Sequence, residues 1–409
     1  MTVPNLLFLT HRLPYPPDKG DRIRTYHLLR YLARYANVHL IAVADEPVPP
    51  EAKEPLAQLC TRVASIPVGH SRWVGALESL ALGGSISEGA YRLPALKKLI
   101  TDWSKEVEYS AVIASASSLA QYLRLPGLAH ATKIVDVVDV DSQKWFDYAA
   151  ATAPPKSWLY ALEGRRLRKT ERDLTSWANA AILVSAGETA IFREATGADN
   201  VFAATNGVDL DYYQPTPGRA ENGCVFVGAL DYKPNIDAAC WFAKSIWPQV
   251  RQQRPEATFR IVGRKPVQAV RDLANIPGIE VPGQVPDVRP YLSGAAVVVA
   301  PLRIARGLQN KVLEALAAGK AVVSSPAAIA GFSHREELPV CIANDPREWI
   351  ARTVQMLGDP VTRQRFGNAG RAYAEKYHDW SACLEPFGRL LGFSQPVAVA
   401  TTDREVCPT

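Results

Sequence analysis

The stretch AAVVVAPLRIARGLQNKVLEALAAGKAVVSS, residues 295–325, contains a strand, a turn, a helix and a second strand in that order. Its first six residues carry no charge, which suits a strand that is covered on both faces. Residues 308–318 are nearly all good helix formers, and Gly319 stands where a helix would end. The stretch therefore predicts one unit of a parallel sheet with its covering helix, and the helix should start near Gly307.

The same alternation of strand and helix runs through the whole chain, which indicates an α/β fold with parallel sheets wrapped by helices. In the first half a Pro/Gly loop leads to a helix from about Asp21, and another helix is expected at 187–197. Helices in the second half are expected near 236–253 and 266–274, and 360–391 should form two more. Strands are expected at 6–10, 38–44, 111–115, 133–139, 180–185, 200–205, 224–230, 258–264, 279–283 and 295–301.

A turn-rich stretch, NGVDLDYYQPTPGRAENG, separates the two halves. It predicts two Rossmann-like, doubly wound domains in tandem. Such domains should face a cleft, with ligands beyond the carboxyl ends of the strands. The predicted parts are an N-terminal domain (1–205), a linker (206–222), a C-terminal domain (223–376), a final helix (377–393) and a tail without periodicity (394–409) that we expect to be disordered.

Composition narrows the class of protein. A chain of 409 residues exceeds one typical hydrophobic core, and its 47% hydrophobic and 21% charged residues are ordinary for a globular protein. A formal charge of +5 favours local basic patches over general nucleic-acid binding. No apolar run approaches the roughly 20 residues of a membrane span, and the first residues are typical of a strand and not of a signal peptide. We therefore expect a cytoplasmic protein whose six scattered cysteines are reduced: Cys60, Cys224, Cys240, Cys341, Cys383 and Cys407.

The turn before the helix of the quoted stretch is rich in positive charge. Arg303 and Arg306 carry guanidinium groups that match phosphate oxygens, and Gly307 lets the backbone approach a ligand closely. A helix N-terminus adds unpaired N–H groups and partial positive charge. This combination predicts a diphosphate site.

A carboxylate follows on the same helix. Arg306, Asn310 and Glu314 are four residues apart and share one face, so Glu314 could accept hydrogen bonds from two ribose hydroxyls. Diphosphate and ribose together indicate a nucleotide. Two alternatives stay open: the arginines could belong to a solvated loop, and Lys311 could simply pair with Glu314.

These motifs resemble the GT-B glycosyltransferases of family 4 over residues 4–392. The resemblance lies in THRLPYPPDKGDRIR after the first strand, TNGVDLDYY at the linker, FVGALDYKPN in the second domain and LEALAAGKAVVSS. Within this family, DVVDVDSQKW, VGALDYKPN and APLRIARGLQNKVLEALAAGKAVV are similar to sugar transferases associated with exosortase and PEP-CTERM systems. The resemblance implies a retaining enzyme with the donor in the C-terminal domain and the acceptor in the N-terminal one.

The resemblance also implies roles for single residues. Glu314 is the second glutamate of the family's E-x7-E pattern, whereas the first falls on Arg306, which is a departure. Where the family often has an Arg and a Lys after the first strand of the second domain, this chain has Ala229 and Lys233. Either Asp139 or Asp141 stands where many relatives have a histidine near the reacting sugar. The predicted catalytic residues are thus Asp139, Asp141, Arg303 and Arg306, and the predicted donor-binding residues are Gly20, Gly228, Lys233, Arg264, Gly307, Leu308, Asn310, Lys311 and Glu314.

The triplet DVD (139–141) also matches the D-x-D that metal-dependent glycosyltransferases of another fold use to bind Mg²⁺. Because the tandem parallel domains argue against that fold, we expect neither a metal nor a further cofactor beside the nucleotide-sugar co-substrate.

The helix predicted over PKSWLYALEGRRLRKTERDL (155–174) has two aromatic residues followed by five basic ones. It could rest on an anionic membrane surface, which would suit a lipid-linked acceptor. Its glutamates equally allow a solvated helix with internal ion pairs.

The sequence therefore predicts a retaining glycosyltransferase that moves a sugar from a UDP- or GDP-sugar to a lipid-linked saccharide in bacterial exopolysaccharide synthesis. The chain shows no convincing general base, so we expect the leaving phosphate to help remove the acceptor proton. Two alternatives remain: a nucleotide-sugar epimerase of the same fold, and a non-catalytic nucleotide-sugar-binding component of a polysaccharide assembly complex.

Overall fold

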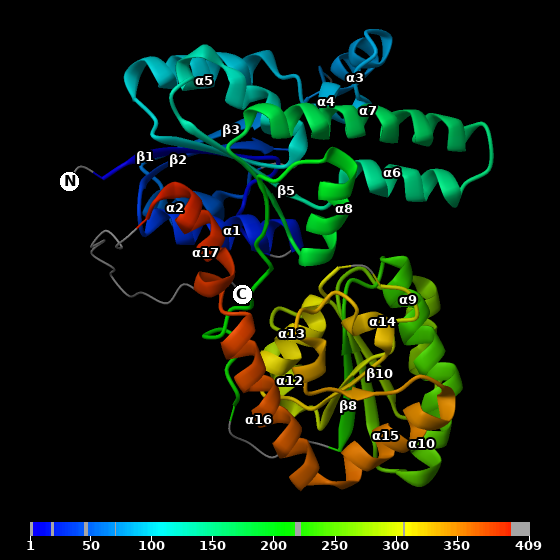
Figure 1. The fold of residues 1–409 in the computed structure, drawn as a ribbon. Helices are drawn as coiled ribbons and strands as arrows, with labels where there is room; N and C mark the ends of the chain where they lie inside the picture. The colour runs from blue at the N-terminus through cyan, green and yellow to red at the C-terminus, as the bar shows by residue number, and fades with distance from the viewer. Residues whose placement is uncertain are drawn as a thin grey trace. The chain divides into compact units, whose positions relative to one another are not determined.

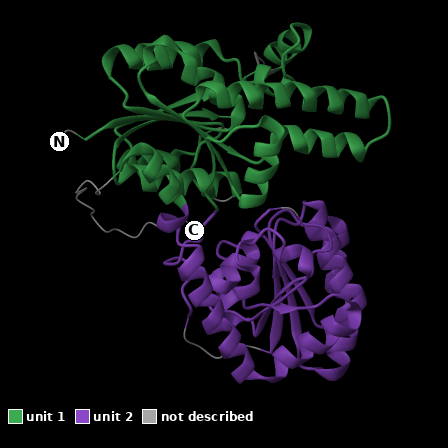
Figure 2. Ribbon diagram, viewed as in Figure 1, with its two compact units in different colours: residues 1–205, 384–404 green, residues 206–383, 405–409 purple. Residues whose placement is uncertain are grey.

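The computed structural model describes residues 3–17, 20–44, 48–69, 71–216, 222–305 and 307–393, with the backbone alone at 71–72. Figure 1 shows the course of the chain, and Figure 2 shows its two compact units. Among the described residues, unit 1 comprises 3–205 and 384–393, and unit 2 comprises 206–383. None of the described helices is long and apolar enough to cross a membrane.

The sheet of unit 1 has seven strands in the order β3-β2-β1-β4-β5-β6-β7, and every pairing is parallel. All five side chains of β4 are buried, as are five of the six in β1, because helices cover both faces of a parallel sheet. The strands are β1 (Asn5–Thr10), β2 (Asn37–Ala44), β3 (Arg62–Pro67), β4 (Ala111–Ser115), β5 (Thr132–Val138), β6 (Ala180–Leu183) and β7 (Val201–Ala203).

The helices of unit 1 include a long hairpin formed by α6 and α7. The final helix, α17, begins in unit 2 and ends in unit 1. There Gly388 packs closely against Tyr31 of α1, because a Cβ at this position would lie 2.3 Å from the Tyr31 hydroxyl. The helices are α1 (Gly20–Ala33), η1 (Pro50–Ala52), α2 (Lys53–Leu59), α3 (Ser71–Ala81), α4 (Ile86–Gly89), α5 (Pro94–Glu106), η2 (Ser117–Arg124), η3 (Pro126–Leu128), α6 (Asp141–Ala150), α7 (Lys156–Trp177), α8 (Ala186–Thr196) and α17 (Trp380–Leu391).

Unit 2 has a second parallel sheet, of six strands in the order β10-β9-β8-β11-β12-β13. Its core is aromatic on the α9–α10 side, where Phe242 packs on Phe259 and Trp349. The strands are β8 (Gly223–Val227), β9 (Thr258–Val262), β10 (Ile279–Gly283), β11 (Val297–Ala300), β12 (Val322–Ser324) and β13 (Cys341–Ile342). The helices are α9 (Lys233–Trp241), η4 (Phe242–Ile246), α10 (Trp247–Gln253), α11 (Gln268–Arg271), η5 (Asp272–Asn275), α12 (Arg289–Gly294), α13 (Asn310–Ala317), α14 (Pro326–Ile329), η6 (Arg335–Glu337), α15 (Pro346–Gly358) and α16 (Pro360–Tyr377).

The predicted α/β fold with two parallel sheets is confirmed, but several details were wrong. The helix expected over 236–253 contains one π-helical turn, η4, which ends two residues before Pro248, whose missing N–H interrupts the α-helical ladder. The helix expected from Gly307 begins only at Asn310, after Gly307 takes a φ of 62°. The expected disorder of the tail concerns residues outside those that the structure describes.

Candidate functional site

Two glycines bring strand ends of unit 2 close together at the carboxyl edge of its sheet. A Cβ at Gly263, directly after β9, would lie 1.7 Å from the Gly228 carbonyl oxygen. A Cβ at Gly228, directly after β8, would lie 2.9 Å from the Asn235 amide nitrogen in α9. The backbone at this edge is therefore packed too closely for larger residues at Gly228, which the sequence had singled out, and at Gly263, which it had not.

Lys311 points from α13 to this edge. Its Nζ donates to Asn235 Oδ1 at 2.5 Å and lies 5.3 Å from the centre of the Phe226 ring. Burial lowers the pKa of Lys311 to about 8, although the charge of Glu314 opposes this. An ammonium group has three donors, and Asn235 accepts from one of them, so Lys311 offers fixed positive charge at the strand ends.

Glu314 lies one turn further along α13. Burial raises the pKa of its carboxyl group to about 7, while Lys311 and the Tyr213 hydroxyl lower it. Burial and the nearby Glu314 carboxylate in turn raise the pKa of Tyr213. The described side chains of Lys311 and Glu314 form no direct ion pair within 4 Å, although each charge shifts the pKa of the other group. Tyr213, from the linker stretch, was not predicted.

Arg303 follows β11 but is already engaged. Its guanidinium donates from Nε to Asp237 Oδ2 at 2.9 Å and makes a second, short contact to Asp237 Oδ1. Both side chains are exposed, so this pair is easily exchanged with water. The sequence could not reveal Asp237 as a partner because it lies on another element, α9. Arg306 lies outside the described residues.

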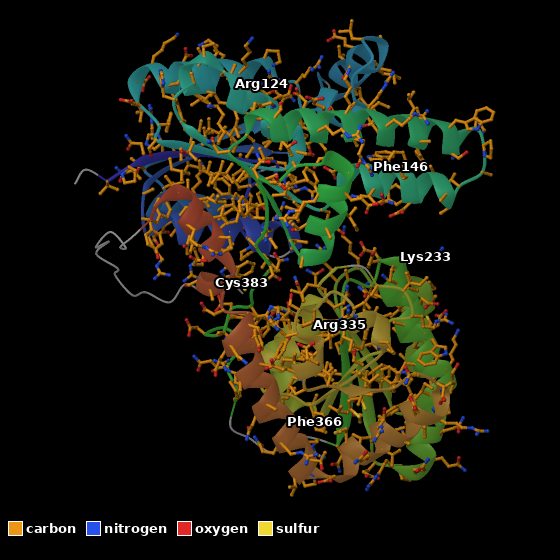
Figure 3. All side chains as sticks on the ribbon, in the orientation of Figure 1. Arg124, Phe146, Lys233, Arg335, Phe366 and Cys383 are labelled. Carbon is orange, nitrogen blue, oxygen red and sulfur yellow. The ribbon has the colours of Figure 1, made fainter. Side chains whose placement is uncertain are left out.

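Two further predicted cations carry no partner among the residues that the structure describes. Arg264, directly after Gly263, is half-buried, and its side chain has no hydrogen bond or ion pair there. Lys233, labelled in Figure 3, is exposed at the start of α9. Lys233 follows β8 and Arg264 follows β9, so both lie at the same edge of the sheet as Lys311. This edge therefore has positive charge without a partner among the described residues.

The entry to α13 contains the remaining predicted residues. Gly307 is exposed with a left-handed φ of 62°, and Leu308 and Asn310 are half-buried. A Cβ at Gly331 would lie 2.2 Å from the Gly307 carbonyl oxygen, so the loop after α14 packs closely against this turn. The Asn310 side chain forms no hydrogen bond with a described residue. At the start of α13 the N–H groups of Val312 and Leu313 donate to the Gln309 carbonyl oxygen, whereas those of Asn310 and Lys311 have no acceptor among the described residues.

In unit 1, the two predicted aspartates behave differently. Asp141, at the start of α6, accepts from Ser117 Oγ at 2.5 Å, and burial raises its pKa although this hydrogen bond opposes the rise. Asp139 is exposed, yet the surrounding protein displaces water and raises its pKa, with Lys144 opposing. Asp139 is thus the carboxyl group that faces solvent.

Unit 1 also contains a histidine that sequence reasoning missed. His11 lies directly after β1, and its Nδ1 is 3.2 Å from the Ser115 carbonyl oxygen at the end of β4. Its Nε2 is 3.4 Å from Asp21, which also accepts from Arg12 at 2.6 Å. Burial opposes ionisation of Asp21, but His11 and Arg12 prevail and hold its pKa well below the ordinary value. The signal was available, since His11 stands in the quoted loop THRLPYPPDKGDRIR. Gly20 is exposed as the first residue of α1.

A buried ion pair fixes this edge of unit 1. Arg24 of α1 donates from Nε and Nη2 to Asp136 of β5 at 2.7–3.2 Å, and its Nη1 donates to the Ala204 carbonyl at 2.8 Å. Both side chains are almost fully buried. Arg24 therefore ties α1, β5 and the end of β7 together, next to the Asp139 loop.

The basic residues of α7 are less free than the sequence indicated. Arg166 donates to the Gly84 carbonyl, Arg168 donates to Ser142 and lies over the Phe146 ring, and Arg172 donates to the Ala195 carbonyl. Phe146 is labelled in Figure 3. Arg165 and Lys169 are exposed, and neither has a partner among the described residues. The five predicted cations are thus reduced to two free ones.

Among the described residues, one group could place three ligand atoms around a metal: His334, Glu336 and Glu337, all exposed. Glu337 already accepts from the Tyr377 hydroxyl and from Lys376. Asp139 and Asp141 do not belong to such a group, so the described side chains offer no third ligand beside the D-x-D triplet.

Residues 221–359 match the family model for glycosyl transferases group 1. No curated protein sequence matches the chain. The fold of the chain is similar to that of sucrose-phosphate synthase from Thermosynechococcus elongatus, with a TM-score of 0.68 at 16% identity over 95% of this chain and 98% of that one.

Two further solved structures share the fold. Alr3699/HepE from Anabaena, in complex with UDP and glucose, gives a TM-score of 0.65 at 14% identity over 95% of this chain and 99% of that one. WaaG, a glycosyltransferase involved in lipopolysaccharide biosynthesis, gives a TM-score of 0.64 at 16% identity over 95% of this chain and 100% of that one. The chain therefore has the GT-B fold, and the family match in unit 2 supports a group 1 glycosyltransferase.

Proposed function

We propose that the protein is a retaining glycosyltransferase that takes its sugar from a nucleotide-diphosphate donor bound at the carboxyl edge of the unit 2 sheet. The observation that carries the proposal is the arrangement of Lys311 and Glu314. An ammonium and a carboxyl group lie one turn apart on α13, beside glycine-lined strand ends, in the part of the chain that matches the group 1 model. UDP-sugars are the first donors to test, since HepE from Anabaena has been solved with UDP and with UDP-glucose.

The positive charge would stabilise the departing diphosphate. Lys311 keeps two donors free beside its bond to Asn235, and the first turn of α13 adds N–H groups. Arg264 and Lys233 supply further charge without a protein partner among the described residues. Charge that is fixed where the leaving group becomes negative is usually the largest contribution to catalysis. Arg303 is held by Asp237 through Nε and Nη2, and its Nη1 has no acceptor among the described residues.

Glu314 would hold the ribose. Its carboxylate can accept from two neighbouring hydroxyls, and the buried position makes each such bond stronger than it would be in water. In the transfer itself the bond between the sugar C1 and the donor phosphate oxygen breaks while a bond from C1 to the acceptor oxygen forms. The acceptor proton passes to the leaving phosphate.

The acceptor would be a lipid-linked saccharide of exopolysaccharide synthesis, reached at a membrane surface. Exposed apolar side chains in unit 1 support this part of the proposal. Trp158 is 70% exposed near the end of the α6–α7 hairpin, and Trp73 and Leu77 on α3 are 72% and 65% exposed. With the free cations Arg165 and Lys169 they provide both components of interfacial binding, apolar burial and attraction to anionic lipid.

Titration calorimetry with UDP, GDP, ADP and dTDP tests the donor site. We expect one of these nucleotides to bind the full chain. Lys311→Met and Glu314→Gln should each weaken its affinity about tenfold or more, and Lys244→Met should leave the affinity unchanged. Lys244 is the matched control because it is exposed in unit 2 and lies on η4, away from the strand ends. Equal affinities for all four proteins would contradict the proposed site.

A further inference from the structure

A cavity of about 550 Å³ lies in unit 2 at the opposite edge of the sheet from Lys311 and Glu314. Asn222, Ala296 and Ala321 line it, and they directly precede strands β8, β11 and β12. Because the strands are parallel, the amino ends of three neighbouring strands border the cavity. It is therefore separate from the donor site, and its size is within the range of small-molecule sites.

Three cationic side chains line this cavity: Arg254, Lys320 and Arg363. Arg254 directly follows α10, and its guanidinium packs against Gly358, where a Cβ would lie 1.9 Å from Nη2, 2.9 Å from Cζ and 3.6 Å from Nε. The Arg254 side chain has no hydrogen bond or ion pair with any residue that the structure describes. All five of its N–H donors are therefore without a protein acceptor there.

The other two cations are fixed at one end and free at the other. Arg363 uses Nη1 for the carbonyl oxygens of Met356 and Leu357, at 2.7 and 2.8 Å, which leaves Nε and Nη2. Lys320 donates to the carbonyl oxygens of Ser293 and Ala295, at 2.5 and 3.1 Å, which leaves one donor. Arg363 and Lys320 therefore each keep at least one N–H donor without an acceptor among the described residues.

These positive charges are close enough to affect one another. Burial lowers the pKa of Lys320 to about 8, and the charge of Arg363 lowers it further. Glu256 is the acidic residue that lines the cavity, and it is exposed and forms no ion pair with the three cations. Like charges held together in a partly dehydrated space repel, and an anion between them would remove that repulsion.

Capping of helix ends explains only part of the arrangement. Lys320 and Arg363 satisfy carbonyl groups near the ends of α12 and α15, as cations at helix C-termini commonly do. Arg254 satisfies no carbonyl group among the described residues, and yet Gly358 leaves room for its guanidinium to pack. A capping role therefore leaves Arg254 without a function.

We propose that this cavity binds a small phosphorylated anion, held by Arg254 and the free donors of Arg363 and Lys320. Guanidinium groups match phosphate oxygens in pairs, which favours phosphate over other anions. The polar lining, with Gln364 and Thr216 beside the cations, suits a phosphorylated sugar or diphosphate more than an apolar ligand. Such a site would let a phosphorylated metabolite act on unit 2 without competing for the donor edge.

The test uses inorganic pyrophosphate and glucose 6-phosphate, titrated into the full chain carrying Lys311→Met and Glu314→Gln so that the donor edge is disabled. We expect binding that Arg254→Gln weakens about tenfold or more and that Arg251→Gln leaves unchanged. Arg251 is the matched control: it lies one turn earlier on α10, its Nη1 packs in the same way against Gly278, and it does not line the cavity.

Sulfate at equal ionic strength separates phosphate recognition from general screening, and UDP reports any remaining donor binding. Thermal unfolding of each variant without anion shows whether Arg254→Gln only destabilises the fold. Absence of pyrophosphate and sugar-phosphate binding, or equal loss in the Arg251 and Arg254 variants, would overturn the proposal.

Discussion

Replacing Glu314 by Gln should change how stability depends on pH. Burial raises the pKa of Glu314 from the ordinary 4.5 to about 7, so the folded protein binds a proton that the unfolded chain has already lost between these values. Ionisation therefore destabilises the fold as pH rises from 4.5 to about 7, and above that the penalty is constant. With about 1.4 kcal/mol for each pH unit, the penalty is about 3 kcal/mol. Glutamine keeps the shape of the side chain but has no group that ionises.

Urea unfolding followed by tryptophan fluorescence and circular dichroism at several pH values measures this difference, provided that the two probes agree. Relative to Glu314→Gln, the unchanged protein should lose about 3 kcal/mol of unfolding free energy between about pH 4.5 and pH 7. Glu336→Gln is the control, because Glu336 is exposed on η6 of the same unit. Parallel pH profiles for the unchanged protein and Glu314→Gln would refute the argument that burial controls this carboxyl group.

Three further predictions concern the fold and the surface. Asp136→Asn should lower the unfolding free energy by about 3–5 kcal/mol, because it leaves the buried charge of Arg24 without its partner, and urea unfolding measures this. Gly263→Ala should lower the melting temperature and weaken UDP binding, since its Cβ would lie 1.7 Å from the Gly228 carbonyl oxygen. Calorimetry measures both quantities, and an unchanged affinity would contradict the close packing at that edge. Replacing Trp73 and Trp158 by Ser should reduce sedimentation with vesicles containing anionic lipid, whereas equal binding would exclude both side chains from the membrane contact.

The sequence predicted the sheets well because buried parallel strands are continuous apolar runs. VVVA in β11 and AVIAS in β4 are short apolar runs that suit a strand covered on both faces, and all of their side chains are buried. β3 was missed because its residues, RVASIP, alternate between half-buried and exposed at the edge of the sheet. Such an alternation in a short segment is a weak signal.

Pairings between distant elements could not be predicted. The sequence identified Glu314 by its spacing from Arg306 and Asn310 on one helix, and the family resemblance added Lys311. Neither indicated that Asn235 and Tyr213 would contact them. Likewise the sequence placed Arg303 at the correct strand end without indicating that Asp237 would occupy it. Spacing defines a helix face, whereas the partners of that face depend on how the sheet brings other loops to the same edge.

The opposite shifts of Lys311 and Glu314 lead to a final prediction about protons. Burial brings the pKa of Lys311 down to about 8 and that of Glu314 up to about 7, so it disfavours both charged forms. A diphosphate favours the ammonium and ribose hydroxyls favour the carboxylate, so a bound donor should move each pKa back. Binding of UDP-glucose should then release a proton from Glu314 at about pH 6.5. At about pH 8.5 the same binding should take up a proton at Lys311. Calorimetry in buffers of different ionisation enthalpy measures this exchange. Glu314→Gln should abolish the release alone and Lys311→Met the uptake alone; proton exchange of one sign over the whole range would show that the two groups do not contact the donor as proposed.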